Sequence, residues 1–139
     1  MSSPEWELHP QLARDTIAIG DLSLSRALLM NDANYPWLLL VPRRAGVVEL
    51  VDLSGPDQAQ LMAEIVRVSD GLRTVAPCDK LNVAAIGNVV PQLHVHIVAR
   101  CRTDPAWPRP VWGLLPPRAY DPAELNRLTT ELRREFRLG

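Results

Sequence analysis

The segment PQLHVHIVAR, residues 91–100, alternates polar and hydrophobic side chains over most of its length. Successive side chains of a β-strand point to opposite faces of the sheet. Gln92, His94 and His96 therefore share one face, and the hydrophobic residues between them share the other. The apolar face pins the register, because a slip of one residue would bury both imidazoles. We predict a strand over residues 93–100.

A row of two imidazoles and one amide suits several roles. Imidazole titrates near neutral pH and serves as a nucleophile, a base or a metal ligand. His94 and His96 fit ordinary structural histidines, two ligands of a zinc ion, or the reactive groups of phosphoryl or nucleotidyl transfer. The two histidines alone leave these three interpretations open.

Hydrophobic periodicity predicts further elements upstream of this segment. The expected elements are a short helix at 9–16 and strands at 16–22, 26–30, 37–41 and 81–86. The strand at 37–41 is apolar on both faces, which is typical of a central strand. Gly87 and Asn88 are expected to form a tight turn between the last two strands.

Capping residues and apolar stripes predict two longer helices. Ser54 is placed to cap a helix whose hydrophobic residues recur at steps of three and four up to Val75. Asp121 is placed to cap a last helix over residues 121–137. Residues 102–120 are rich in proline, so an extended arm is expected there.

These elements together predict a single α+β domain over residues 1–139. Its strands come in hairpin-like groups and do not alternate with helices. The expected architecture is a mostly antiparallel five-stranded sheet with a long central helix and a C-terminal helix.

Composition narrows the class of protein. Hydrophobic residues make up 47% of the chain and charged residues 22%, as in ordinary globular proteins. The net charge of -1 gives no reason to expect a nucleic-acid partner. No apolar run is long enough to span a membrane and the first residues lack a secretory pattern, so we expect a cytoplasmic protein with no membrane partner. Cys78 and Cys101 are expected to be reduced and without a role.

Residues 92–99 resemble the signature of the histidine-triad (HIT) superfamily, in which three alternating histidines are each followed by a hydrophobic residue. Residues 28–32, the turn after them and residues 37–44 look like the family's early strand, acidic turn and next strand. The resemblance covers residues 16–112. It implies a HIT-like fold and a homodimer, with the early and late strands at the interface.

The resemblance also implies roles for the three polar residues of the signature. In the family the middle histidine attacks the α-phosphate of a nucleotide, and water or another acceptor resolves the nucleotidyl-histidine intermediate. His94 matches that position, and His96 matches the last histidine, which positions the phosphate and the leaving group. Gln92 replaces the first histidine, and its amide cannot be protonated near pH 7. The mechanism requires no cofactor or metal, and the expected ligand is a purine nucleotide or nucleotide conjugate.

Substrate-binding residues follow from the same resemblance. Asp32 matches the carboxylate that holds the ribose hydroxyls, and Asn31 stands beside it, although both also suit an ordinary turn. Asn88 lies where the family has polar contacts to the phosphate or leaving group, and it also suits a left-handed turn position. Trp107 and Trp112 belong to an arm that packs on its own subunit or reaches the partner's site.

Three functions therefore compete. The first is a nucleotide hydrolase or nucleotidyl transferase that acts at an α-phosphate through His94. The second is a nucleotide-binding module with weak turnover, because Gln92 replaces a histidine. The third is a metal-binding protein that uses His94 and His96.

Overall fold

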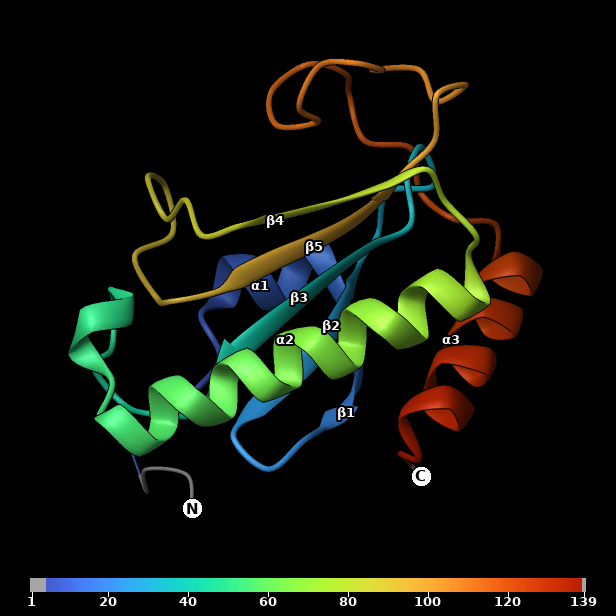
Figure 1. Cartoon of the computed structure of the whole chain (residues 1–139). Coiled ribbons are helices and arrows are strands. Elements are labelled where there is room, and N and C mark those ends of the chain that lie inside the picture. Colours follow the sequence, from blue (N-terminus) through green and yellow to red (C-terminus); the bar gives the residue numbers. More distant parts are fainter. Residues whose placement is uncertain (1–4, 139) are drawn as a thin grey trace.

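The structure, a computed structural model, describes residues 5–138 and contains one five-stranded sheet (Figure 1). The strands are β1 (Thr16–Asp21), β2 (Ser25–Met30), β3 (Trp37–Pro42), β4 (Lys80–Ala84) and β5 (Val95–Arg100). The helices are α1 (Pro10–Asp15), α2 (Gly55–Val75), α3 (Pro122–Phe136) and the 3-10 turn η1 (Leu50–Asp52). The predicted α+β architecture is confirmed, with the long central helix and the C-terminal helix in place.

The sheet has the strand order β1-β2-β3-β5-β4, and every neighbouring pair is antiparallel. β3 is the central strand, as its two apolar faces predicted. In the pairing of β3 with β5, Leu39 lies opposite His96 and Trp37 lies opposite Val98. Trp37 and His96 therefore project from the same face of the sheet.

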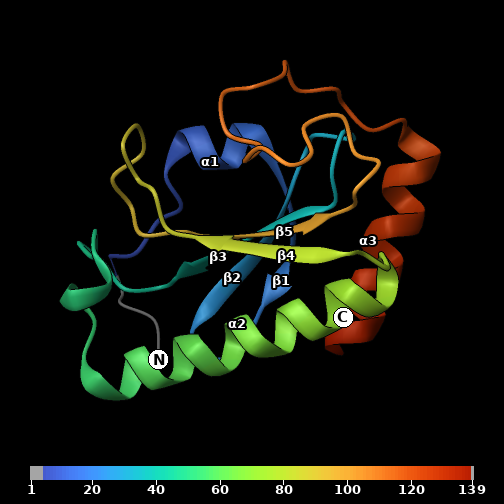
Figure 2. The same cartoon turned by 45° about the horizontal axis from the view of Figure 1, so that its top comes forward.

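Both faces of the sheet are covered (Figure 2). α2 packs on one face, over a core that includes Leu38, Leu40 and Ile97. α1, the N-terminal segment and the chain after β5 cover the other face, which carries the histidines. As a result, His94 and His96 are only 7% and 5% exposed. The expectation that the correct register keeps both imidazoles from burial is therefore wrong, because covering segments from both ends of the chain lie over them.

Both long helices begin where the sequence predicted. The Ser54 side chain accepts a hydrogen bond from the Asp57 amide at 3.2 Å, and the Asp121 side chain accepts one from the Glu124 amide at 3.2 Å. The predicted apolar stripe of α2 omitted a buried carboxylate. Glu64 is buried and accepts hydrogen bonds from the amides of Leu24 and Ser25 at 2.8 and 3.0 Å. It thereby fastens α2 to the β1–β2 connection.

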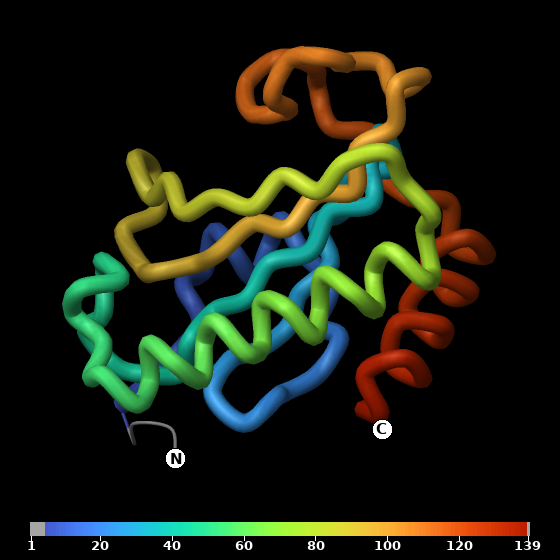
Figure 3. The backbone as a smooth tube through the Cα atoms, viewed as in Figure 1, coloured from blue at the N-terminus to red at the C-terminus, as the bar shows by residue number. Residues whose placement is uncertain are grey.

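The connection between β4 and β5 differs from the predicted tight turn. β4 ends at Ala84 and β5 begins at Val95, so residues 85–94 form a loop that runs beside the segment before η1 (Figure 3). Pro91 has no amide hydrogen for the ladder, and the Leu93 amide donates to the carbonyl of Val47 at 3.1 Å instead of to β4. Residues 93 and 94, predicted as strand, therefore belong to the loop.

The chain after β5 folds into successive turns and does not extend as a straight arm. Arg100, at the end of β5, is buried between the rings of Tyr35 and Trp107, each 5.7 Å from its guanidinium carbon. Its guanidinium also forms an ion pair with Asp104 at 2.8 Å. Burial alone would raise the pKa of Asp104, but the hydrogen bonds from Arg100 and from backbone amides lower it below its usual value. Arg100 thus holds the arm against its own chain.

Candidate active site

His94 lies at the end of the 85–94 loop, immediately before β5. Its Nδ1 is 2.7 Å from the main-chain carbonyl oxygen of Gln92. Because a carbonyl oxygen can only accept, the neutral ring carries its hydrogen on Nδ1 and keeps the lone pair of Nε2 free. A nucleophile needs such an unprotonated nitrogen.

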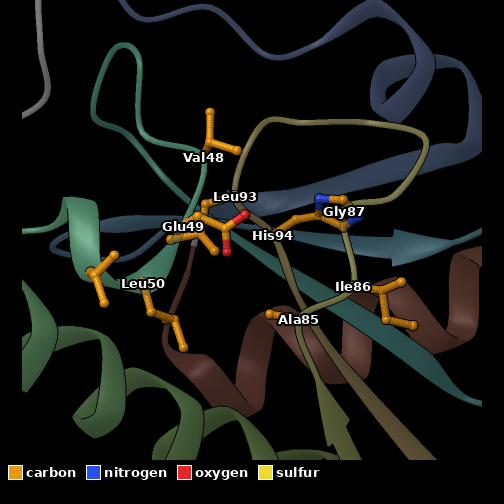
Figure 4. Close-up of a pocket in the computed structure, with 9 residues that line it drawn as sticks. Val48, Glu49, Leu50, Ala85, Ile86, Gly87, Leu93 and His94 are labelled. Atoms are coloured by element: carbon orange, nitrogen blue, oxygen red, sulfur yellow. The ribbon is translucent and has the colours of Figure 1, made fainter.

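His94 lines a cavity of about 320 Å³ (Figure 4). Residues 48–51 form one side of this cavity and residues 85–87 form the other, with Leu93 and His94 between them. Glu49 brings a carboxylate to a lining that otherwise consists, apart from His94, of apolar side chains and a glycine. The lining contains no lysine or arginine. We call this space the His94 cavity.

His96 is held by an indole. The Nε1–H of Trp37 donates to Nδ1 of His96 at 3.0 Å, so the neutral imidazole carries its hydrogen on Nε2. Its ring lies 4.9 Å from the ring of His94, in an edge-to-face arrangement. Burial, and to a smaller extent the charge of His94, lowers the pKa of His96 to about 4. His96 is therefore neutral at physiological pH and presents a hydrogen-bond donor.

The arm after β5 contributes a second indole to the site. The ring of Trp112 lies 5.3 Å from that of His96 and 6.1 Å from that of Trp37, edge-on to both. Trp107 lies over Arg100 instead. Of the two arrangements that the sequence allowed for the arm, the structure has Trp112 packed onto the histidine of its own chain.

Gln92, at the position of the missing histidine, directs its amide away from the His94 cavity. Its Oε1 accepts a hydrogen bond from the His9 amide at 2.8 Å, and its Nε2 donates to the carbonyl of Glu7 at 2.8 Å. Both polar atoms of the side chain are thus engaged by the backbone of the N-terminal segment, and Gln92 is absent from the cavity lining.

Asp32 and Asn31 line a second cavity, of about 500 Å³, which also borders Trp37 and the arm. Oδ1 of Asp32 accepts hydrogen bonds from the amides of Asn34 and Arg118 at 3.0 and 3.2 Å. Oδ2 has no hydrogen-bond partner among residues 5–138. Oδ1 of Asn31 accepts from the amide of Tyr120 at 3.0 Å, so its carbonyl oxygen holds the arm. We call this space the Asp32 cavity.

The two cavities flank one row of rings. Trp37 borders the Asp32 cavity and bonds to His96, whose ring contacts that of His94 at the other cavity. Predicted residues 31, 32, 94 and 96 are therefore brought together along one face. Asn88 is not among them: it is exposed on the loop, and the left-handed backbone belongs to Gly87, with φ of 67°.

Sequence reasoning missed Trp37 and the 48–51 segment as parts of the site. Trp37 had no local signal, because its contact with His96 requires the pairing of β3 with β5. The 48–51 segment had none, since its residues reach the site only through the path of the chain around the sheet. No cluster of three metal-ligating side chains occurs within the described part of the chain, and both cysteines are free thiols.

Comparison with known proteins gives a consistent result. The sequence profile of the HIT domain matches residues 11–103. A histidine triad protein from Bradyrhizobium japonicum is 59% identical, with a TM-score of 0.93 over 95% of this chain and 98% of that chain. Corresponding proteins from Marinobacter aquaeolei VT8 (41% identity, TM-score 0.92, 96% of this chain and 98% of that one) and Sinorhizobium meliloti 1021 (40%, 0.92, 94% and 97%) are also similar. A search of curated proteins found no match.

Proposed function

The chain belongs to the HIT domain family, and from this premise we propose that it is a nucleotide hydrolase or nucleotidyl transferase with His94 as its nucleophile. Members of the family are generally nucleotide-binding hydrolases or transferases. The single observation that carries the proposal is the hydrogen bond of 2.7 Å from Nδ1 of His94 to the carbonyl of Gln92. It leaves Nε2 unprotonated beside a cavity that can take a leaving group.

The proposed reaction has two displacements at phosphorus. First, the lone pair of Nε2 of His94 forms a bond to the α-phosphorus while the bond to the leaving group breaks. Water or another acceptor then attacks the phosphorus, and the nitrogen recovers its electron pair. With water, the phosphorus gains a hydroxyl group, and the second proton of the water is released to solvent and replaces the one that the leaving group took up as it departed. Such transfer depends mainly on positioning and on charge stabilisation, to which the neutral Nε2–H of His96 contributes a hydrogen bond.

The Asp32 cavity is the proposed site of the nucleoside. A carboxylate oxygen with free lone pairs is well suited to accept hydrogen bonds from ribose hydroxyls, and Oδ2 of Asp32 meets that description. Apolar side chains of Met30, Trp37 and Val111 border the same space and suit the faces of a purine. The proposed ligand is a purine nucleotide or nucleotide conjugate.

The test of the function is release of AMP from adenosine phosphoramidate, in EDTA, by the wild type and by His94→Ala. We expect release by the wild type. In the variant the rate should fall by about a thousandfold or more, because removal of a nucleophile abolishes the covalent route. A diadenosine polyphosphate, assayed in parallel, compares an amine with a phosphate leaving group.

Each other outcome selects a different function. Equal release by His94→Ala would overturn the role of His94. Absence of release, with the nucleotide still raising the melting temperature, would point to a binding module. Absence of both, with stoichiometric zinc retained by the protein, would favour metal binding through His94 and His96.

We also propose that two copies of the chain associate through an apolar face beside the His94 cavity. The face consists of exposed hydrophobic side chains on η1, α2, β4 and the 85–94 loop: Leu50, Val51, Met62, Val66, Val83, Ile86 and Val89. Val51 is 83% exposed and Val89 is 90% exposed, which is costly for a monomer in water. β4 is an edge strand, and it can pair with the same strand of a second copy about a twofold axis. The other edge strand, β1, contacts α1 and α3.

A further inference from the structure

We propose that Gln92 is a positioning residue whose side chain couples the N-terminal segment, residues 6–9, to the tautomer of the nucleophile His94. The proposal rests on the proposed function in so far as His94 is the nucleophile. It assigns Gln92 a role other than direct contact with the substrate. The coupling runs from the backbone of residues 6–9 to the Gln92 amide, and from the Gln92 carbonyl to the imidazole of His94.

The amide of Gln92 matches the backbone of the N-terminal segment in both polarity and direction. An amide side chain directs one acceptor and one pair of donors to the same side. Gln92 uses them on the amide of His9 and on the carbonyl of Glu7, both at 2.8 Å, much as a neighbouring strand would. The two nitrogens of an imidazole point in divergent directions, so a histidine at this position could not make both bonds.

The N-terminal segment is itself anchored, so it can hold Gln92 in place. The Trp6 ring lies 5.0 Å from the guanidinium carbon of Arg26, and Trp6 and Leu8 pack against the core of the histidine face. Nδ1 of His9 accepts a hydrogen bond from the amide of Gln11 at 3.0 Å, which caps α1. The Gln92 amide thus joins the 85–94 loop to a helix that leads directly into β1.

The other attachments of the loop fix the residues on either side of Gln92 and not its carbonyl. Residues 85–89 are exposed, Val90 and Leu93 are buried, and the Leu93 amide bonds to Val47. The carbonyl of Gln92 is the acceptor for Nδ1 of His94, so a shift of the Gln92 backbone removes the partner that selects the tautomer. The Gln92 side chain therefore acts on the chemistry through its own main chain.

A direct catalytic contact is the competing role for Gln92. To reach a substrate, the amide would have to give up both bonds to the N-terminal segment. The half-buried amide of His9 would then lose its acceptor, and the carbonyl of Glu7 would lose its donor. The engaged amide favours a positioning role.

The test removes the hydrogen bonds between Gln92 and the N-terminal segment, once by a change at His9 and once by a change at Gln92. Each variant has a matched control. His9→Pro removes the amide hydrogen that Gln92 accepts, and the φ of His9, -55°, suits proline. His9→Ala keeps that hydrogen and removes only the cap of α1. Gln92→Met removes the amide at similar length, and Gln11→Met removes an amide that bonds only to the exposed side chains of Arg14 and Asp15.

The first readout is the ¹⁵N shift pattern of the His94 ring by NMR, which reports the tautomer without any substrate. We expect one Nδ1–H tautomer in the wild type and both controls, and a mixture in His9→Pro and Gln92→Met. The second readout is hydrolysis of adenosine phosphoramidate. There we expect kcat to fall about tenfold in the same two variants while KM stays within about twofold. The reason is that these variants change the orientation of the nucleophile and not the binding of the substrate.

The outcomes separate this proposal from the proposed function. An unchanged His94 tautomer in folded His9→Pro and Gln92→Met would overturn the coupling, whatever the activity. A rise in KM alone in Gln92→Met, with His9→Pro unaffected, would instead show direct contact with the substrate. A tautomer that responds in a protein without hydrolytic activity would support the coupling and refute the catalytic function.

Discussion

At the residue scale, His96 is enclosed by two indole rings and a second imidazole. Trp37 donates to it at 3.0 Å, and Trp112 covers it at 5.3 Å between ring centres. Such surroundings exclude water and favour the neutral ring. His96 can therefore serve as a steady hydrogen-bond donor over the whole physiological pH range, but not as a cationic group.

The same burial makes the stability of the fold depend on pH. The pKa of His96 is about 4 in the folded chain and about 6.5 in an unfolded chain, so between these values the unfolded state binds more protons. The contribution of neutral His96 to the free energy of unfolding is therefore fully present above pH 6.5 and is lost as the pH falls to 4. The largest loss is about 3 kcal/mol. Urea unfolding at pH 7, 5.5 and 4.5 measures the loss.

His96→Asn is the matched variant for this measurement. The Asn oxygen takes the place of Nδ1 and can accept from Trp37, but the side chain does not titrate. Its stability is expected to vary less than that of the wild type over this window. Parallel curves for the two proteins would refute the role of His96. Asp21 and Asp104, whose pKa values are lowered, do not confuse the result, because they contribute equally to both proteins.

How far the sequence predicts the site also depends on single residues. Strand alternation placed His94 and His96 on one face, and this holds because the alternation is local. The direction of the Gln92 amide could not be predicted, because its partners lie 83 and 85 residues away in the chain. The same applies to the indole of Trp37, whose contact with His96 requires the pairing of β3 with β5.

At the element scale, the crossing of α2 and α3 depends on a glycine. Gly71 is buried in α2, and a β-carbon there would overlap the ring of Phe136 and lie 3.0 Å from Cγ of Glu135. Arg67, one turn earlier, donates to the carbonyl of Phe136. The two helices thus approach each other closely where a side chain is absent.

Gly71→Ala is expected to destabilise the protein by about 1 kcal/mol. Alanine improves helix propensity by about 1 kcal/mol, but the overlap with Phe136 forces the helices apart, and overpacking costs about 1–3 kcal/mol. Gly55→Ala, in the first turn of the same helix, meets nothing within 4 Å and should be neutral or slightly stabilising. The urea midpoints of the two variants test this, and a Gly71→Ala variant at least as stable as the wild type would contradict it.

The boundaries of the elements were predictable where the signal is local. The caps at Ser54 and Asp121 depend on residues within three positions, and both were correct. The turn at Gly87 was wrong in length, because the loop follows a distant partner, Val47, through the Leu93 amide. Glu64 lies beside the apolar stripe of α2 because its carboxylate accepts hydrogen bonds from amides at the β1–β2 connection, which are distant in sequence.

At the scale of the whole molecule, the apolar face beside the His94 cavity leads to a prediction about assembly. The wild type should sediment as a dimer, with twice the 15.5 kDa mass of one chain. Met62→Glu combined with Val83→Asp should reduce this to a single copy, because both side chains are exposed on the apolar face and charges are costly in an apolar interface. Sedimentation velocity provides the measurement.

Leu114→Glu is the control for this pair, since Leu114 is an exposed hydrophobic residue of the arm and not part of the apolar face. It should leave the mass of the assembly unchanged. A single-copy wild type at tens of micromolar, or a double variant that still sediments as a pair, would refute the proposed interface.

No described helix has the length and apolar character to cross a membrane.

The row of rings is assembled from parts of the chain that are made at very different times. Trp37 meets His96 across 59 residues, His9 meets Gln92 across 83, and Asp32 meets Arg118 across 86. Contacts of such long range slow folding, because the loop must close before the contact stabilises it. A ribosome that has released the first hundred residues has produced both histidines, but neither Trp112 nor Arg118. On a nascent chain, the complete candidate site is therefore among the last features to form.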